Sequence, residues 1–234
     1  MSEIASDAWA DVRPPRPAAA RIRANLSRFR WLLLPGMALY VVSGLLMSAV
    51  MPPEMMSYDF AAQQEASRQL AEQPGTLIGI MAASLLSLLG FGLLVTGVVF
   101  QMILHYQCWA VLADDRPRTT PGRAVGFLFI PLFNIWWLVP SLIGLDRDQG
   151  RALAARGLSA PATPAIWTGL LMAIFAIQIP LLAWHWTAPS ILGQVLSFIL
   201  ILPATLLFVL IHARTGRAAA LIAEHDAGRE DRTP

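Results

Sequence analysis

The chain has 234 residues, of which 56% are hydrophobic and 14% are charged, and its formal net charge is +2. A soluble domain carries about 25% charged residues, and several uncharged runs here approach the roughly 20 residues that cross a bilayer as a helix. The composition therefore excludes an ordinary soluble protein and predicts an all-α, polytopic membrane protein. The single cysteine, Cys108, excludes an intrachain disulfide.

The N-terminal segment, 1–30, is basic. Within it, Ile22, Leu26 and Phe29 fall on one face of a helix predicted over 18–30, and arginines surround that face. This pattern predicts a cytoplasmic amphipathic helix that lies on anionic lipid. The alternative is a positive flank that only orients the first membrane span.

Four apolar runs predict the transmembrane helices of a membrane domain over 31–213. They cover 31–51, 76–111, 162–184 and 191–211. The first run is too long for the apolar core of a signal peptide, which predicts an uncleaved anchor. A short external helix is expected within 57–73. The cytoplasmic tail, 214–234, is expected to continue the last span as a helix over 217–224.

A fifth uncharged run, Gly126–Leu145, is long enough to cross a bilayer but contains Pro131 in its first half. Pro131 cannot donate a backbone hydrogen bond and disfavours helical geometry at the residue before it. Thr120-Pro121 has the N-cap and first-turn pattern of a helix start. We therefore predict a re-entrant or broken-helix segment over 121–145. Asn134 is expected to be buried and to bond either the backbone groups that the break frees or the Gln101–His105 face of the second span.

The arginines distinguish a re-entrant segment from a full crossing, because cytoplasmic loops collect them. A crossing at 126–145 divides the arginines nine to eight between the two sides, whereas re-entry places sixteen on the cytoplasmic side and only Arg68 outside. Re-entry is therefore favoured, with both termini cytoplasmic. The alternative is a kinked full span with the two tails on opposite sides.

Small and polar residues share faces of the predicted spans. On the second span, Gln101 and His105 continue a face of small residues, which are Gly79, Ala83, Ser87, Gly90 and Gly97. The fourth span has a similar face, formed by Ala165, Gly169, Ala173, Ala176 and Pro180. Such faces let helices pack closely in lipid. We also expect Gln178 to hydrogen-bond Gln194, because the two lie at similar depth on adjacent spans.

No metal or cofactor is expected. His105 and His212 fall near the cytoplasmic ends of their spans, and Cys108 follows His105 by one helical turn. These side chains are of types that ligate metal or haem. An isolated His-x-x-Cys pair is a weak signal, however, and interfacial histidines are common, so we interpret the three as packing residues.

No catalytic residue is expected either. The sequence contains no Ser-His-Asp set and no glycine-rich phosphate loop. Its carboxylate pairs, Asp114-Asp115 and Asp146 with Asp148, sit beside arginines. We interpret them as parts of solvated, self-neutralising loops. The alternative is a lipid-headgroup enzyme at that surface.

Residues Arg118–Asp148 read RTTPGRAVGFLFIPLFNIWWLVPSLIGLDRD. This stretch resembles a motif of uncharacterised bacterial integral membrane proteins, roughly TTPGKAVGF-FIPFFN-YW and then GLAKDLN, some of which carry a GYF-like module (the domain of unknown function 4339 class). The matching positions include Thr120, Pro121, Gly122, Gly126, Pro131, Asn134, Trp137 and Asp148. Trp136 stands where that family tends to tyrosine, and Gln149-Gly150 where it tends to Leu-Asn. The resemblance implies a shared element and the bacterial inner membrane as the compartment, and it implies no activity.

Three functions follow from these patterns. The favoured one is a non-enzymatic scaffold or a subunit that binds other membrane proteins, or a second copy, through its small-residue faces, with membrane lipids around it. The first alternative is a small transporter or permeation protein whose re-entrant segment lines a path, although no Asp, Glu or Arg lies within an apolar core. The second alternative is the lipid-active enzyme. No nucleic-acid partner is expected.

Overall fold

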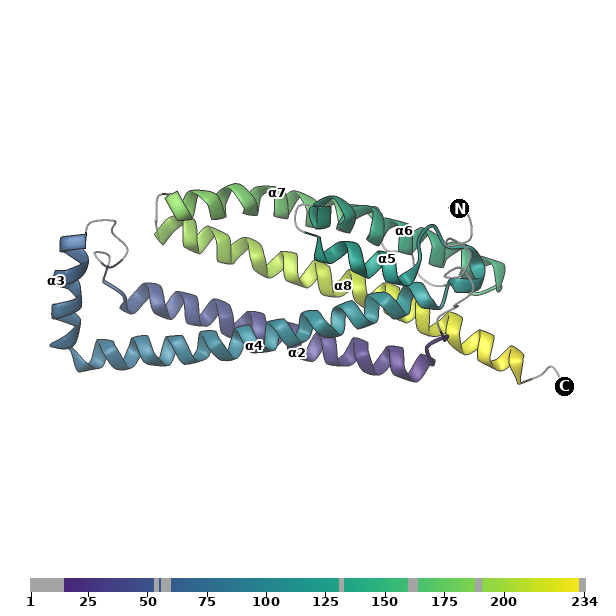
Figure 1. Cartoon of the computed structure of the whole chain (residues 1–234), viewed down its shortest axis with the longest axis horizontal. Coiled ribbons are helices and arrows are strands. Elements are labelled where there is room, and N and C mark those ends of the chain that lie inside the picture. The colour runs from purple at the N-terminus through teal and green to yellow at the C-terminus, as the bar shows by residue number, and fades with distance from the viewer. Residues whose placement is uncertain are drawn as a thin grey trace, which may run out of the picture. The chain divides into compact units, whose positions relative to one another are not determined.

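The computed structural model of the chain describes residues 15–52, 55, 60–130, 133–159, 164–187 and 191–231. The described secondary structure is helical throughout (Figure 1), which confirms the predicted all-α class. Its elements are α2 (Ala19–Val50), α3 (Phe60–Ala71), α4 (Pro74–Ala110), η2 (Ala113–Asp115), α5 (Pro121–Gly126), η3 (Phe127–Phe129), α6 (Phe133–Ala155), α7 (Ala165–Thr187) and α8 (Ile191–Glu230).

Within the described residues, three helices are long and apolar enough to cross a membrane, namely α2, α4 and the Val195–Glu230 part of α8. The described apolar stretch of α7 is shorter and covers Ile166–Gln178. The described residues thus show three of the four predicted spans as candidates, and the span predicted over 162–184 stays a prediction. Side chains such as Ile78 and Leu88 on α4 are 67% and 69% exposed. Apolar side chains so exposed suit contact with lipid, which does not disfavour them as water does.

The basic segment and the first apolar run form one helix, α2, which begins at Ala19. The exposed fractions of Ile22 and Leu26 are 0% and 7%. Asn25, on the same face, donates a hydrogen bond to Oε1 of Gln107 on α4 at 3.1 Å. The prediction that this apolar face lies on lipid is therefore wrong. The face carries a buried amide that needs a protein partner, and it packs inside the protein.

The contacts divide the chain into two units. The first consists of Met1–Arg28, Val99–Thr168 and Leu210–Pro234, and the second of Phe29–Val98 and Gly169–Val209. The helices α2, α4, α7 and α8 contribute residues to both. The described part of the first unit holds 13 Arg and 8 Asp or Glu, a net charge of +5, whereas that of the second holds two of each and is neutral.

In the second unit, α2 and α4 cross closely where Gly36 faces Gly90. A Cβ atom at Gly90 would lie 2.8 Å from the backbone nitrogen of Tyr40 and 3.0 Å from the carbonyl oxygen of Gly36. A Cβ atom at Gly97 would lie 3.1 Å from the backbone nitrogen of Leu33. The small-residue face of α4 therefore packs against α2, as a close crossing of two helices in lipid requires.

Candidate functional site

The fifth apolar run is a broken helix. Thr120 has an extended backbone, and its Oγ1 accepts a hydrogen bond from the backbone nitrogen of Arg123 at 3.3 Å, so it caps α5 at the predicted position. The helical backbone ends with η3, and Ile130 is extended, with φ −87° and ψ 113°. Helical structure resumes at Phe133. The predicted N-cap and the predicted break are both present.

Two contacts tie the halves of this broken helix together. The indole nitrogen of Trp137 on α6 donates to the carbonyl oxygen of Ala124 on α5 at 3.1 Å. The rings of Phe127 and Trp137 meet edge to face, with centroids 5.1 Å apart. α6 is therefore held against α5, so the chain folds back after the break.

Four other positions of the Arg118–Asp148 motif are either outside the described residues or show no packing role. Pro131 and the side chain of Asn134 lie outside the described residues, so their roles in the break stay predictions. A Cβ atom at Gly122 or Gly126 would meet nothing within 4 Å, so packing does not require glycine at either position.

Asp148 closes the base of this hairpin. Its Oδ2 accepts a hydrogen bond from the backbone nitrogen of Arg118 at 3.0 Å. Its Oδ1 lies 3.2 Å from Nε of Arg118 and 2.6 Å from Nη2 of Arg151. Asp148 lies on α6, and its side chain is only 3% exposed. The prediction of a solvated loop is therefore wrong here: a buried carboxylate joins the chain before α5 to α6.

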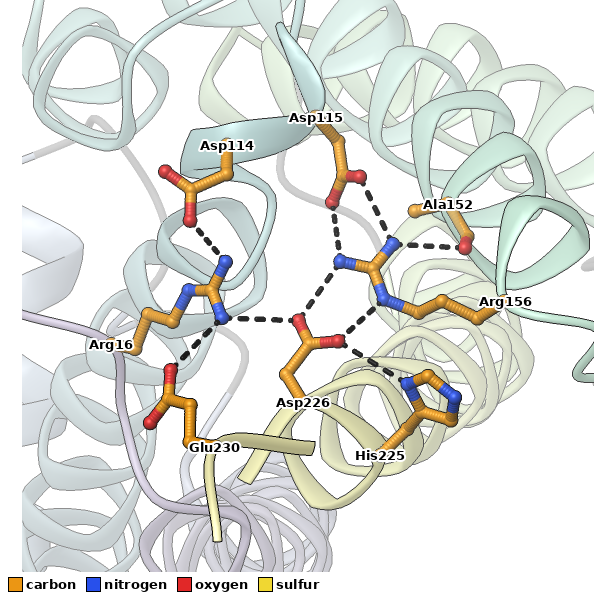
Figure 2. A network of polar contacts seen from close by, with 8 residues as sticks. All are labelled: Arg16, Asp114, Asp115, Ala152, Arg156, His225, Asp226 and Glu230. Atoms are coloured by element: carbon orange, nitrogen blue, oxygen red, sulfur yellow. Dashed lines mark hydrogen bonds and ion pairs between the residues drawn. The ribbon is translucent and has the colours of Figure 1, made fainter. Parts of the chain in front are cut away.

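Arg156, just beyond α6, is the centre of a second polar cluster (Figure 2). Its Nη1 and Nη2 donate to the two oxygens of Asp115 at 2.9 and 3.0 Å. Its Nε and Nη2 donate to the two oxygens of Asp226 on α8, both at 2.8 Å. Nη1 also donates to the carbonyl oxygen of Ala152 at 2.9 Å. These contacts use all five N–H donors of the guanidinium group.

The cluster continues from Asp226 to the N-terminal side of α2. Arg16 forms ion pairs with Asp114, with Asp226 at 3.3 Å and with Glu230 at 3.7 Å (Figure 2). The hydrogen bonds that Arg156 donates to Asp226 hold the pKa of Asp226 below its usual value and raise the pKa of Arg156. Four parts of the chain that lie far apart in sequence are thus joined by ion pairs.

A surface cavity of about 370 Å³ opens beside this cluster. Its lining consists of Arg16, Asp115, Ala155, Arg156, Asp226, Arg229 and Glu230. The lining contains three arginines and three carboxylates, so their charges cancel. Such a cavity suits a polar partner and has no excess charge to select an anion or a cation.

A third polar cluster is buried between α4, α6 and α8. Nε2 of Gln101 lies 3.0 Å from Nε2 of His212. Nε2 of His105 lies 2.7 Å from Oγ of Ser141 and accepts the indole N–H of Trp109 at 3.3 Å. All five side chains are buried. The predicted polar face of α4 therefore points to where the helix packs, as expected.

Sequence reasoning missed several buried polar residues that bond from one helix to another. Ser141 on α6, Asn25 on α2 and Gln149 on α6 were not singled out, although Gln149 donates to the carbonyl oxygen of Thr215 at 3.1 Å. It also missed Arg156 and Asp226 as a pair. The available signal was that each is a polar residue on a face that is otherwise apolar or small.

The predicted bond between Gln178 and Gln194 stays a prediction, because the side chain of Gln194 lies outside the described residues. Nε2 of Gln178 lies 3.4 Å from the backbone oxygen of Ser197, three residues further along α8. The helix to which Gln178 points is thus the expected one.

The structure places the suspected metal ligands in packing contacts. The rings of His105 and His212 have centroids 6.1 Å apart, and Cys108 is buried. Among the described residues, no group of three or more His, Cys, Asp or Glu is placed to hold a metal ion. Comparison with protein-family models, with curated proteins and with solved structures finds no match.

Proposed function

We propose that the protein is a non-enzymatic, multi-pass membrane protein of the bacterial inner membrane that serves as a scaffold or partner-binding subunit. The observation that supports this proposal most is that several buried polar groups form hydrogen bonds within the chain itself. All five N–H donors of the Arg156 guanidinium group form hydrogen bonds within the chain. Gln101, His105 and Asp148 also bond to residues on neighbouring segments. A catalytic acid or base must instead reach a substrate proton.

In this proposal α2, α4, α7 and α8 cross the membrane, and the segment from Arg118 to Arg156 enters from the cytoplasm and returns. The contacts at its base support the return, because Asp115 bonds Arg156 and Arg118 bonds Asp148. A bilayer core about 30 Å thick cannot separate two side chains in contact. The +5 charge of the first unit supports the cytoplasmic side as the side on which its charged segments lie.

Of the two predicted small-residue faces, the one on α7 remains exposed and available to a partner. Gly169, Ala173, Ala176 and Pro180 are exposed and share one helical face. The corresponding face of α4 is covered by α2, so it is not free for another protein. In lipid, small residues let a second helix approach closely. We therefore infer that another membrane helix, from a partner or a second copy, packs on α7.

Site-specific photo-crosslinking in membranes tests this function. A photoreactive residue at Ala173 is expected to capture one protein, either another membrane protein or a second copy of the chain. The matched control is Leu85 on α4, which is 66% exposed and apolar, and which should capture lipid alone. Lipid adducts alone at both positions would contradict the proposed partner face.

A further inference from the structure

Two guanidinium groups converge on Asp148 at the base of the hairpin. Nε of Arg118 and Nη2 of Arg151 both contact Oδ1 of this carboxylate. The side chains of Arg118 and Arg151 are 52% and 64% exposed, whereas that of Asp148 is 3% exposed. The carboxylate therefore lies inside, and it fixes two outward-facing cations next to each other.

This trio has a net charge of +1 and unused donors. A guanidinium group has five N–H donors. Within the described part of the chain, the only polar contact of each of these two guanidinium groups is with Asp148: Nη2 of Arg151 donates to it, and Nε of Arg118 forms an ion pair with it. Arg156 is the contrasting case, since all of its donors are bonded. Arg118 and Arg151 can therefore bind an anion through their remaining N–H groups and keep their contacts with Asp148.

The positions of Asp148 and Arg151 along α6 indicate which anion is available to this site. The uncharged run ends at Leu145, and at 1.5 Å per residue Asp148 and Arg151 lie about 4.5 and 9 Å beyond it. Each headgroup layer of a bilayer is roughly 5–8 Å thick outside the hydrocarbon core. Both guanidinium groups contact Asp148. In the orientation of the proposed function, they therefore lie at the depth of the lipid phosphates.

We propose that Arg118 and Arg151 bind the phosphate of an anionic phospholipid in the cytoplasmic leaflet, with Asp148 as the residue that sets their spacing. The planar guanidinium group binds phosphate through paired N–H donors. Two such groups around one lipid phosphate would anchor the hairpin to the membrane surface. The choice of lipid as the source of the phosphate rests on the proposed function.

Native mass spectrometry of the full-length chain in mild detergent tests the proposal, with phosphatidylglycerol titrated against zwitterionic phosphatidylcholine. The parent chain should bind phosphatidylglycerol preferentially. The variant Arg118→Gln/Arg151→Gln should bind it about tenfold more weakly or worse, because two cations of the site are lost. The matched control, Arg21→Gln/Arg217→Gln, removes two other exposed arginines of the first unit and should bind nearly as the parent does.

Asp148→Asn gives a prediction of the opposite sign. The amide oxygen still accepts the hydrogen bond from Arg118, but the competing negative charge is gone, so phosphatidylglycerol should bind as tightly as in the parent chain or more tightly. If the double arginine variant unfolds, the triple variant Arg118→Gln/Asp148→Asn/Arg151→Gln leaves no buried charge unpaired. The comparison of that triple variant with Asp148→Asn then decides the result.

Equal weakening by both double variants would overturn the proposal, since binding would then follow total charge alone. Displacement of phosphatidylglycerol by millimolar inorganic phosphate would show a site for free phosphate and overturn the lipid assignment. Because this measurement is made in detergent, it does not depend on the partner face or the topology. If photo-crosslinking at Ala173 captures no protein but phosphatidylglycerol still binds selectively, the proposed function is overturned and the proposed anion site is retained.

Discussion

Arg156 donates to both carboxylate oxygens of Asp115, at 2.9 and 3.0 Å, although 41 positions separate the two residues in the chain. Between them lie α5, the break at Ile130 and α6, including the whole uncharged run. The contact therefore joins the two ends of this segment. Asp226 on α8 holds the same guanidinium group from its other edge, which fixes both ends of the hairpin to the last helix.

Arg156→Gln should be among the most destabilising single changes near this surface. The substitution removes the cation that lies between Asp115 and Asp226 and leaves Asp226 with its ion pair to Arg16. Breaking a buried ion pair by removing one partner costs about 3–5 kcal/mol. Arg156 and Asp226 are 10% and 11% exposed, so we expect a value near the lower end. Thermal unfolding of the detergent-solubilised chain measures this loss of stability.

The control for that change is Arg23→Gln. Arg23 pairs with Glu224, but the two side chains are 56% and 42% exposed, and exposed pairs contribute about 1 kcal/mol or less. An equal loss of stability in Arg23→Gln and Arg156→Gln would show that the cluster around Arg156 does not hold the fold.

The same cluster predicts a loss of stability in acid. Because Arg156 lowers the pKa of Asp226 in the folded chain, the carboxylate stabilises the fold above its unfolded pKa of about 3.9 and loses this effect as the pH falls through the lower folded value. Asp226→Asn should therefore be less stable than the parent chain at pH 7. The difference between their unfolding midpoints should shrink below about pH 4, and a difference that is constant down to pH 3 would contradict this prediction.

Gly90→Ala should weaken the crossing of α2 and α4. The added methyl group would meet backbone atoms of Tyr40 and Gly36, which cannot move aside as a side chain can, and overpacking typically costs about 1–3 kcal/mol. Gly92→Ala, two residues away on the same helix, has nothing within 4 Å of the added group. It should leave the unfolding midpoint unchanged or raise it slightly, because alanine favours helix. Equal effects of the two substitutions would be inconsistent with a close crossing.

The buried amide pair of Asn25 and Gln107 allows a double-mutant test. Asn25→Leu removes one partner and leaves the other polar group buried, at a cost of about 1–3 kcal/mol. The double variant Asn25→Leu/Gln107→Leu leaves no amide unpaired and should be more stable than Asn25→Leu alone. A double variant whose loss equals the sum of the two single losses would indicate that the amides do not interact.

Local patterns in the sequence were sufficient to predict most of the helices. The cap at Thr120 and the break before Pro131 were predictable because both depend on backbone chemistry within a few residues. The continuation of the last span into the tail also follows from local sequence, and α8 runs to Glu230. The polar face of α4 was predictable because Gln101 and His105 continue the steps of its small residues.

The partners of those polar residues were not predictable in the same way. Whether Asp148 is solvated or buried depends on where Arg118, thirty positions earlier, lies after folding. The lipid-facing assignment of Ile22 and Leu26 failed for a similar reason. An apolar face opposite arginines looks the same in sequence whether lipid or another helix covers it, and only the pairing of Asn25 with Gln107 decides between them.

Cysteine labelling from the two sides of the membrane tests the re-entrant hairpin most directly. Gly122 and Ala155 are exposed residues near its two ends, and Glu72 after α3 is the opposite-side reference. The buried native Cys108 sets the background in the parent chain. A membrane-impermeant thiol reagent should label Gly122→Cys and Ala155→Cys from the cytoplasmic side alone, and Glu72→Cys from the outer side alone. Labelling of Ala155→Cys from the outer side, with Gly122→Cys still cytoplasmic, would contradict the account and make the segment a full span.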